Sequence, residues 1–208
     1  GSQILLWYNV FMVLPILTVP HPILRQKSQT VAQIDKKVLG FIKDLEDTLV
    51  HQNKPRGVGL SAPQVGKLWR IFATYLPADK PILQIFINPT IVSASKKLTL
   101  GPSATGRSSS GRKTPIMEGC LSIPKIYGPV YRHSWIKLKY QSINTSDSGQ
   151  LVPSAVEGDS SEVKFTDFPA RVIQHELDHL DGILFTDRSL KTKLPLYEDK
   201  NGQLVELA

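Results

Sequence analysis

The chain has 208 residues, 41% of them hydrophobic, with one cysteine and a formal net charge of +7. This length supports one hydrophobic core and is short for two full domains, and a single cysteine excludes an intrachain disulfide. The charge does not indicate a DNA partner, because five of the cations fall in residues 93–117, which contain no acid, and the rest of the chain is close to neutral.

Residues 1–20 carry no charged side chain and are largely apolar. A membrane span or a signal peptide is not expected, because Asn9, Pro15 and Pro20 interrupt the apolar run and no basic residue precedes it. Gly1-Ser2 is typical of the residues that a cleaved tag leaves. We therefore expect residues 1–11 to be a tag remnant followed by an N-terminal extension.

Apolar periodicity predicts the regular elements of the first half. Isoleucine, valine and leucine recur every three or four residues within residues 33–53, which predicts an amphipathic helix. Residues 69–74 and 82–88 are rich in β-branched and aromatic side chains and predict two strands, the second ending at Asn88-Pro89. Residues 93–117 are rich in glycine, serine and basic side chains, and we expect a flexible basic insertion there.

The second half begins with further strand signals. Residues 135–141 alternate apolar and polar side chains and predict a strand, and residues 162–165 predict a shorter one. Residues 144–161, between them, are polar and rich in turn formers. Near the C-terminal end, Asn201-Gly202 stands between two apolar runs, which predicts a β-hairpin.

The stretch between Asp167 and Gly182 predicts a short helix, with Asp167 as its N-cap and Gly182 as its C-terminal stop. His175 and His179 are four residues apart and lie on one face of this helix, so they can fill two corners of a tetrahedral metal site. Glu176 directly follows the first histidine. Its carboxylate can therefore reach a metal-bound water without being a ligand itself.

A third ligand distinguishes a metal site from two incidental histidines, and three places could supply it. One class of metalloprotease continues the motif to a further histidine, but this chain has Phe185 at that position. A second class uses a downstream glutamate, for which Glu198 is in range, although it lies in the expected hairpin. The third source is Cys120, which together with the two histidines leaves a fourth position open for water.

Three separated motifs resemble those of the peptide deformylase family. They are residues 57–64 (Gly-Val-Gly-Leu-Ser-Ala-Pro-Gln), 118–122 (Glu-Gly-Cys-Leu-Ser) and 174–182 (Gln-His-Glu-Leu-Asp-His-Leu-Asp-Gly). Ser61 departs from the first motif, which has alanine there. The resemblance runs from Met12 to Arg188. It implies an α+β fold with mixed or antiparallel sheets packed around a central metal-binding helix, an N-terminal amphipathic helix and a β-type C-terminus.

The resemblance implies a single catalytic domain over residues 12–208 that hydrolyses the formyl group from the N-terminal formyl-methionine of new polypeptides. It implies one divalent metal ion, natively Fe2+, with Zn2+, Ni2+ or Co2+ able to take its place. The implied metal ligands are Cys120, His175 and His179. Glu176 is implied as the general base, with the oxyanion held by the Gln64 side chain and the Leu121 backbone N–H.

Further residues are implied around these ligands. Arg132 is expected to pair with Asp178 and so to orient the ligand helix. The implied substrate-binding residues are Val58, Gly59, Gly119, Tyr127 and Gly128. Ser61 adds a hydroxyl that needs a partner if it is buried, and we expect it to have a small effect on activity.

Two other functions stay open from the residues alone: a zinc endopeptidase with Glu198 as third ligand, and a structural metal site without activity. For a deformylase, we expect formyl-methionyl nascent peptides as substrates, a cytoplasmic monomer, and neither DNA nor membrane as a partner. Residues 93–117 leave open a ribosome contact through ribosomal RNA. A tolerated surface insertion is favoured, because added loop length costs little entropy.

Overall fold

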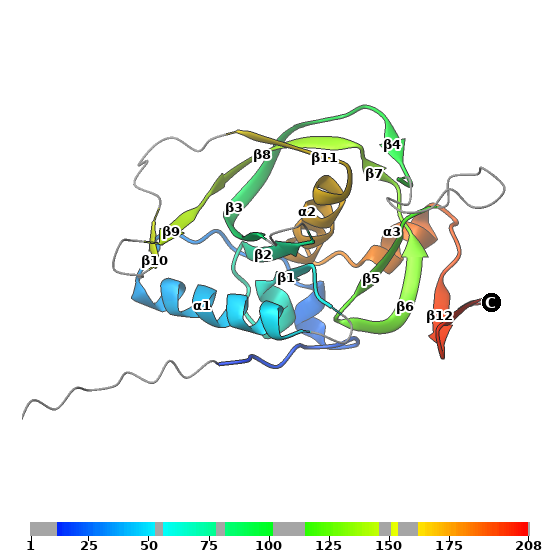
Figure 1. Ribbon diagram of the computed structural model, residues 1–208, viewed down its shortest axis with the longest axis horizontal. Helices are drawn as coiled ribbons and strands as arrows, with labels where there is room; N and C mark the ends of the chain where they lie inside the picture. Colours follow the sequence, from blue (N-terminus) through cyan, green and yellow to red (C-terminus); the bar gives the residue numbers. More distant parts are fainter. Residues whose placement is uncertain are drawn as a thin grey trace, which may run out of the picture.

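A computed structural model gives the structure of the protein and describes residues 12–52, 56–77, 82–101, 115–145, 151–153 and 162–207. Three α-helices and a set of antiparallel β-sheets make up these residues, so the α+β class is confirmed (Figure 1). None of the helices in these ranges combines the length and the hydropathy that a membrane crossing requires.

A five-stranded antiparallel sheet forms the larger layer. Its strands, in spatial order, are β1 (Gly59–Ser61), β2 (Ile71–Leu76), β3 (Ile82–Ala94), β8 (Trp135–Gln141) and β11 (Val163–Thr166). Successive side chains of a strand point to opposite faces of a sheet. In β2, Ile71 and Ala73 accordingly enter one hydrophobic core, whereas Phe72 enters another. Both faces of the sheet are therefore covered.

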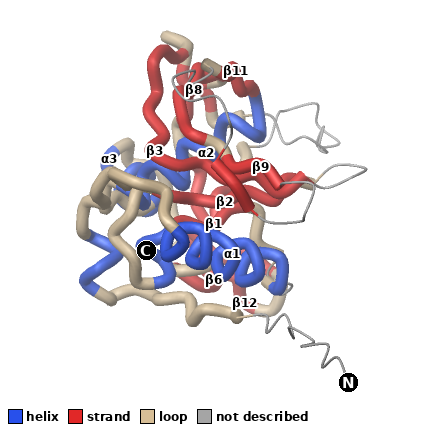
Figure 2. The backbone as a smooth tube through the Cα atoms, turned by 90° about the vertical axis from the view of Figure 1, so that its left-hand side faces the viewer, coloured by secondary structure: helices blue, strands red, loops and turns tan. Residues whose placement is uncertain are grey.

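One helix covers each face of this sheet. Helix α1 (Lys36–His51) packs on the face that carries Ile71 and Ala73. Helix α2 (Asp167–Leu180) packs on the opposite face, against Phe72 and other aromatic and aliphatic side chains. In both views of the backbone, β1 and β2 lie between the two helices (Figure 1, Figure 2).

A second sheet lies on the far side of α2 (Figure 1). Its strands, in spatial order, are β13 (Gln203–Glu206), β12 (Tyr197–Lys200), β6 (Ile123–Pro129) and β5 (Met117–Cys120). Helix α3 (Phe185–Lys191) packs on this sheet through Phe185, next to Ile123 and Val130. Strand β5 thereby brings Cys120, at its end, toward α2.

Short elements complete the fold. They are the strand pairs β4 (Leu98–Thr99) with β7 (Arg132–His133) and β9 (Ile143–Thr145) with β10 (Leu151–Pro153), and the 3-10 helices η1 (Pro22–Arg25) and η2 (Ala62–Val65). We expected a flexible insertion over residues 93–117, and this prediction is wrong at both ends, because residues there belong to β3, β4 and β5. Residues 102–114 and residues 1–11 lie outside the described residues, so the expectations for them stay predictions.

Strand β3 continues past Asn88-Pro89, where the sequence predicted its end. Asn88 has a φ of 51°, and the register between β3 and β8 shifts between Ile87 and Thr90. Such a shift is a β-bulge, where residues leave the ladder, so the N–H that Pro89 lacks is not required there. The Asn88 side chain instead bonds to the backbone of Val31, accepting at 2.8 Å and donating at 2.9 Å.

The predicted strand over residues 135–141 and the C-terminal hairpin are confirmed. The hairpin turn has φ of 56° at Asn201 and 86° at Gly202, and a two-residue type I′ turn requires positive φ at both positions. Helix α2 starts at Asp167 with Thr166 as N-cap, one residue earlier than expected. Gly182 follows the helix with a φ of 71°, and a Cβ there would lie 2.6 Å from the Arg25 carbonyl oxygen.

The packing of Phe86 against α2 gives a stability prediction. Phe86 is fully buried in β3 and stacks on Phe72 with a ring-centroid distance of 4.6 Å. Phe86→Ala is expected to lower the free energy of unfolding by about 4 kcal/mol, because it opens a cavity in a core. The melting temperature should fall by roughly 10 °C.

The matched control is Ile82→Ala in the same strand, where the side chain is 67% exposed. This variant should melt within about 2 °C of the unmodified protein. Equal losses for both variants would contradict the assignment of Phe86 to the core.

Candidate metal centre and active site

Three side chains that can bind a metal converge between α2 and β5. Helical spacing puts His175 and His179 on one face of α2, with their ring centroids 5.0 Å apart. Cys120 approaches from the end of β5, and its Sγ lies 3.1 Å from His179 Nε2. The ligand atoms of the three residues all lie within 4.8 Å of one another. Within the described ranges, this is the one group of three or more such residues found.

The donor set suits a divalent metal ion. One sulfur and two imidazole nitrogens are ligands that Zn2+ and similar borderline metals accept, and three protein ligands leave one position open. Burial lowers the pKa of His179 well below its ordinary value, which favours the neutral imidazole that a metal requires. His179 Nδ1 is buried without a hydrogen-bond partner among the described residues. The residues present therefore fit a metal ion.

Glu118 orients His175 from behind. Its Oε2 lies 3.0 Å from His175 Nδ1, and because a carboxylate accepts, Nδ1 acts as the donor and Nε2 is left available as a ligand. Arg132 donates to both carboxylate oxygens, at 2.9 and 2.8 Å, and Arg171 donates to Oε1 at 2.8 Å. Burial alone would raise the pKa of Glu118, but Arg132 and His175 hold it far below its ordinary value. The carboxylate is therefore ionised and acts as an acceptor.

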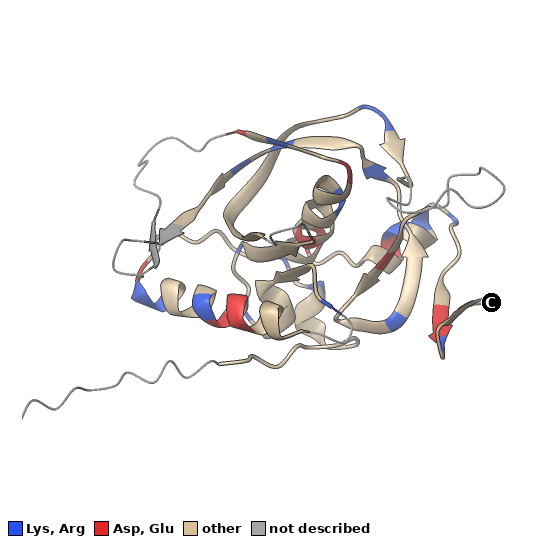
Figure 3. Cartoon of the chain, in the orientation of Figure 1, with Lys and Arg blue, Asp and Glu red and all other residues tan. Residues whose placement is uncertain are grey.

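The same arginine connects this carboxylate to the next turn of α2. Arg132 Nη1 donates to Asp178 Oδ2 at 2.5 Å, and Arg188 of α3 also donates to both oxygens of Asp178. Acidic and basic segments accordingly lie side by side where β5, α2 and α3 meet (Figure 3). Arg132 thus lies between two carboxylates, one of which orients a histidine.

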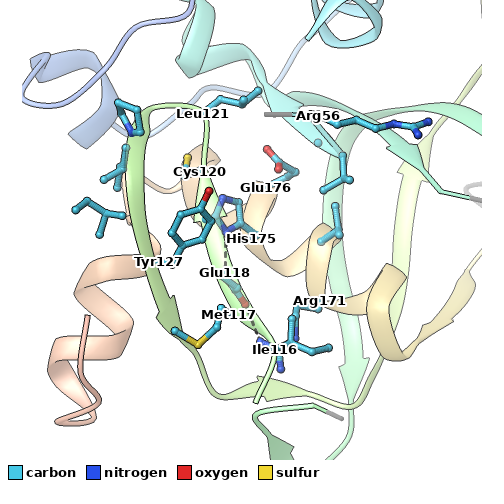
Figure 4. A pocket seen from close by; sticks show the side chains of 18 of the residues that line it. Arg56, Ile116, Met117, Glu118, Cys120, Leu121, Tyr127, Arg171, His175 and Glu176 are labelled. Atoms are coloured by element: carbon cyan, nitrogen blue, oxygen red, sulfur yellow. Dashed lines mark hydrogen bonds and ion pairs between the residues drawn. The ribbon is translucent and has the colours of Figure 1, made fainter. Parts of the chain in front are cut away.

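Glu176 lies on α2 beside His175 and reaches into the same space (Figure 4). Its side chain is buried, and its Oε2 has no hydrogen-bond partner among the described residues. Burial raises the pKa of Glu176 to about 7. Its Oε1 lies so close to Gly59 that a Cβ added there would be 2.3 Å away. The glycine therefore makes room for the carboxylate itself.

Gln64 presents its amide to the sulfur. Its Nε2 lies 3.5 Å from Cys120 Sγ and 3.2 Å from Ser122 Oγ. Its Oε1 accepts hydrogen bonds from both N and Oγ of Ser61, each at 2.8 Å. The Ser61 hydroxyl is buried and has the partner that it requires. Leu121 lies in the turn between β5 and β6, on the wall of the same cavity.

A cavity of about 660 Å³ opens beside these groups (Figure 4). Four of the predicted substrate-binding residues line it: Val58, Gly59, Gly119 and Tyr127. The ring of Tyr127 covers Gly119, where an added Cβ would lie 2.7 Å from Tyr127 Cε1. Gly128 is not among the lining residues, and a Cβ there would meet Leu196 at 2.7 Å, so the structure does not place it with the others.

The cavity also has an apolar wall. Its members are Ile116, Leu121, Ile123, Ile126, Phe168 and Val172. Arg171 lies at the same wall, with its guanidinium bound by Glu118 and by the carbonyl oxygens of Val130 and Thr99. An apolar side chain of a ligand could therefore be enclosed next to the candidate metal centre.

Sequence reasoning did not identify Glu118, Arg171 and Arg188 as parts of the centre. The signal that could have found Glu118 was its place as the first residue of the motif 118–122, two residues before the sole cysteine. Glu198, the alternative third ligand, lies on β12, where its carboxylate pairs with Lys200 at 3.3 Å. It is not part of the cluster found among the described residues.

Comparison with known proteins gives a consistent result. Residues 13–194 match the Polypeptide deformylase family. A peptide deformylase of Pseudothermotoga lettingae is 34% identical over 176 residues, which cover 85% of this chain and 82% of that protein. Peptide deformylase 2 of Nostoc sp. is 34% identical over 201 residues, which cover 93% and 95%.

The fold is also similar to that of a solved structure. A peptide deformylase from Acinetobacter baumannii, bound to Met-Ala-Ser, has a TM-score of 0.63 and 28% sequence identity. The similarity covers 86% of this chain and 99% of that chain.

The buried arginine gives a second stability prediction. Arg132→Met leaves Glu118 and Asp178 each short of a cation, although Arg171 and Arg188 still contact them. The free energy of unfolding is expected to fall by about 3 kcal/mol, because a partly unpaired carboxylate stays buried. Urea denaturation measures the loss.

Arg25→Met is the matched control, because Arg25 pairs with Asp187 at the surface, with its side chain 52% exposed. This change should cost less than about 1 kcal/mol. A loss for Arg132→Met no larger than for Arg25→Met would show that the buried pairs contribute little.

Proposed function

The chain belongs to the peptide deformylase family and removes the N-formyl group from new polypeptides, and we propose that Cys120, His175 and His179 hold the metal ion of this reaction. The observation that supports this most directly is the set of three ligand atoms within 4.8 Å of one another, beside a buried carboxylate and an open cavity. We propose Fe2+ as the native ion. Zn2+, Ni2+ or Co2+ could occupy the same donor set.

When bound, a divalent metal ion supplies Lewis-acid chemistry toward water and the formyl carbonyl. Glu176 is the proton carrier in this proposal. Its Oε2, which has no partner in the described residues, accepts a proton from the attacking water and then passes it to the leaving amine. A pKa near 7 suits a group that must both accept and donate a proton at neutral pH.

Two neutral donors hold the carbonyl oxygen as negative charge develops on it. They are Gln64 Nε2, which lies 3.5 Å from the Cys120 sulfur, and the backbone N–H of Leu121. Fixed dipoles aimed at that oxygen stabilise the transition state without first having to reorganise. Glu118, Arg132 and Asp178 contribute indirectly, because they fix the ring of His175 and the position of α2.

The cavity supports a substrate with an N-terminal methionine. The relative from Acinetobacter baumannii is described with Met-Ala-Ser bound, and we propose that the corresponding cavity takes the N-terminus of a formylated chain here. Its apolar wall suits the methionine side chain. Val58, Gly59, Gly119 and Tyr127 would contact the peptide.

The wider setting of the enzyme also belongs to this proposal. We propose a cytoplasmic monomer, with the lone cysteine kept reduced. A ribosome contact through residues 93–117, of which 102–114 lie outside the described residues, remains the less favoured alternative.

The function is tested with two substrates side by side. Formyl-Met-Ala-Ser should be deformylated, whereas an unformylated peptide should not be cleaved at an internal bond. Cys120→Ala should lose its metal, as measured by metal analysis of anaerobically purified protein. It should also lose deformylase activity, as measured with the formylated peptide. Metal retention in Cys120→Ala together with internal cleavage would support the endopeptidase instead.

Glu176→Ala tests the proton carrier. Metal content should stay at the level of the unmodified protein, because Glu176 is not a ligand. Turnover of the formylated peptide should fall roughly 10²- to 10⁴-fold, the contribution of a general acid–base group. Glu198→Ala is the matched control and should retain normal turnover. Near-normal turnover of Glu176→Ala would refute its role.

Gly59→Ala tests the space that Glu176 occupies. The added methyl group requires the carboxylate to move, since the nearest oxygen would be 2.3 Å away. A displacement of about 1 Å at the reacting groups is expected to lower kcat on the order of 10²-fold. Gly40→Ala, with no atom within 4 Å of its Cβ, should leave kcat unchanged. Equal activity of the two variants would remove this role from Gly59.

A further inference from the structure

We propose that Ser61 is a positioning residue for deformylation: its buried hydroxyl anchors the Gln64 amide so that Nε2 stays directed at the metal centre. The inference rests on the function proposed for Gln64 above. Gln64 lines the cavity, whereas Ser61 is not among the lining residues. Ser61 therefore acts through its neighbour and not on the substrate.

The two residues form a closed hydrogen-bonded unit. Both are buried, with 0% of Ser61 and 1% of Gln64 exposed. Gln64 is the third residue of η2, and its side chain folds back over Ser61, the N-cap of that helix. Gln64 Oε1 accepts from Ser61 N and from Ser61 Oγ, each at 2.8 Å. These two bonds use both lone pairs of the amide oxygen.

Saturation of the oxygen determines where the amide nitrogen points. The other side of the amide meets Cys120 Sγ at 3.5 Å and Ser122 Oγ at 3.2 Å. A flipped amide would place its NH2 group against the Ser61 backbone N–H, donor against donor, so the backbone bond sets the orientation. The Ser61 hydroxyl adds a second hydrogen bond to the same oxygen, which restricts rotation of the Gln64 amide.

The hydroxyl also affects the strength of the donor. Hydrogen bonds to a carbonyl oxygen polarise the amide, and its N–H groups then become stronger donors. Nε2 would meet the developing oxyanion with that added polarity. The effect belongs to the transition state, so it should change kcat more than KM.

One alternative involves Glu176, because burial raises the pKa of that carboxylate and an interaction with the Ser61 side chain opposes the rise. A single hydroxyl proton cannot be donated to both acceptors at once. A test must therefore separate an effect through Gln64 from an effect through Glu176.

A double-mutant cycle makes this separation in the metal-loaded enzyme. Ser61→Ala removes one oxygen and adds no atom, and it should lower kcat for formyl-Met-Ala-Ser roughly 3- to 10-fold with KM almost unchanged, the effect of one neutral hydrogen bond. In the Gln64→Ala background the same change should have no further effect. Ser28→Ala removes another buried hydroxyl, 4% exposed, and is the matched control with unchanged kcat.

A second measurement does not depend on activity. In zinc-loaded, ¹⁵N-labelled protein, the side-chain NH2 signals of Gln64 are assigned by their loss in Gln64→Ala. Ser61→Ala should shift or broaden these signals, whereas Ser28→Ala should leave them unchanged.

The outcomes distinguish the two levels of the proposal. An equal loss of kcat from Ser61→Ala with and without Gln64 would overturn it, because Ser61 would then act through Glu176 or through packing. Unchanged NH2 signals would overturn it as well. Normal turnover of Gln64→Ala would refute the role of Gln64, while the NH2 signals would still decide whether Ser61 holds the amide.

Discussion

The carboxylate of Glu118 makes the contacts on which the rest of the centre depends. It accepts hydrogen bonds from His175 and Arg171 of α2 and from Arg132 of β7. A buried carboxylate without such donors would cost several kcal/mol. With them, it connects β5 to both neighbouring elements and fixes the ring of a proposed ligand. The position of the ligand set therefore follows from a charge balance that extends well beyond the three ligands.

Helix α2 carries two rows of side chains with different roles. An apolar row packs in the core, and a polar row contacts the residues around the proposed metal ligands. Ala170, Ile173, Leu177 and Leu180 repeat at helical spacing and pack on the larger sheet. Arg171, His175 and Asp178 repeat at the same spacing and contact Glu118 and Arg132 on the other side. All residues from Ala170 to Leu180 are buried. Two sheets enclose the helix, so its polar row must find partners within the protein.

The residues by themselves predicted the local features, whereas the contacts of Cys120 with His179 and of Arg132 with Asp178 were expected only through the family resemblance. The spacing of His175 and His179 predicted a shared helix face, and Asn201-Gly202 predicted the turn, since each depends on a few consecutive residues. The end of β3 at Pro89 was wrong, because a bulge removed the constraint that proline imposes. The partners of Glu118 could not be predicted, since no periodicity states which strand faces which turn of a helix.

The distance along the chain between Cys120 and His179 links the chemistry to the stability of the fold. An ion held by both would join residues 59 positions apart, much as a covalent cross-link does. A covalent cross-link closing a loop of that length would restrict the unfolded chain by about 4 kcal/mol, whereas an ion that leaves on unfolding stabilises the protein through its affinity for the folded site. Ion affinity and resistance to unfolding are then two measures of one equilibrium, so a chelator would act on this protein as a mild denaturant.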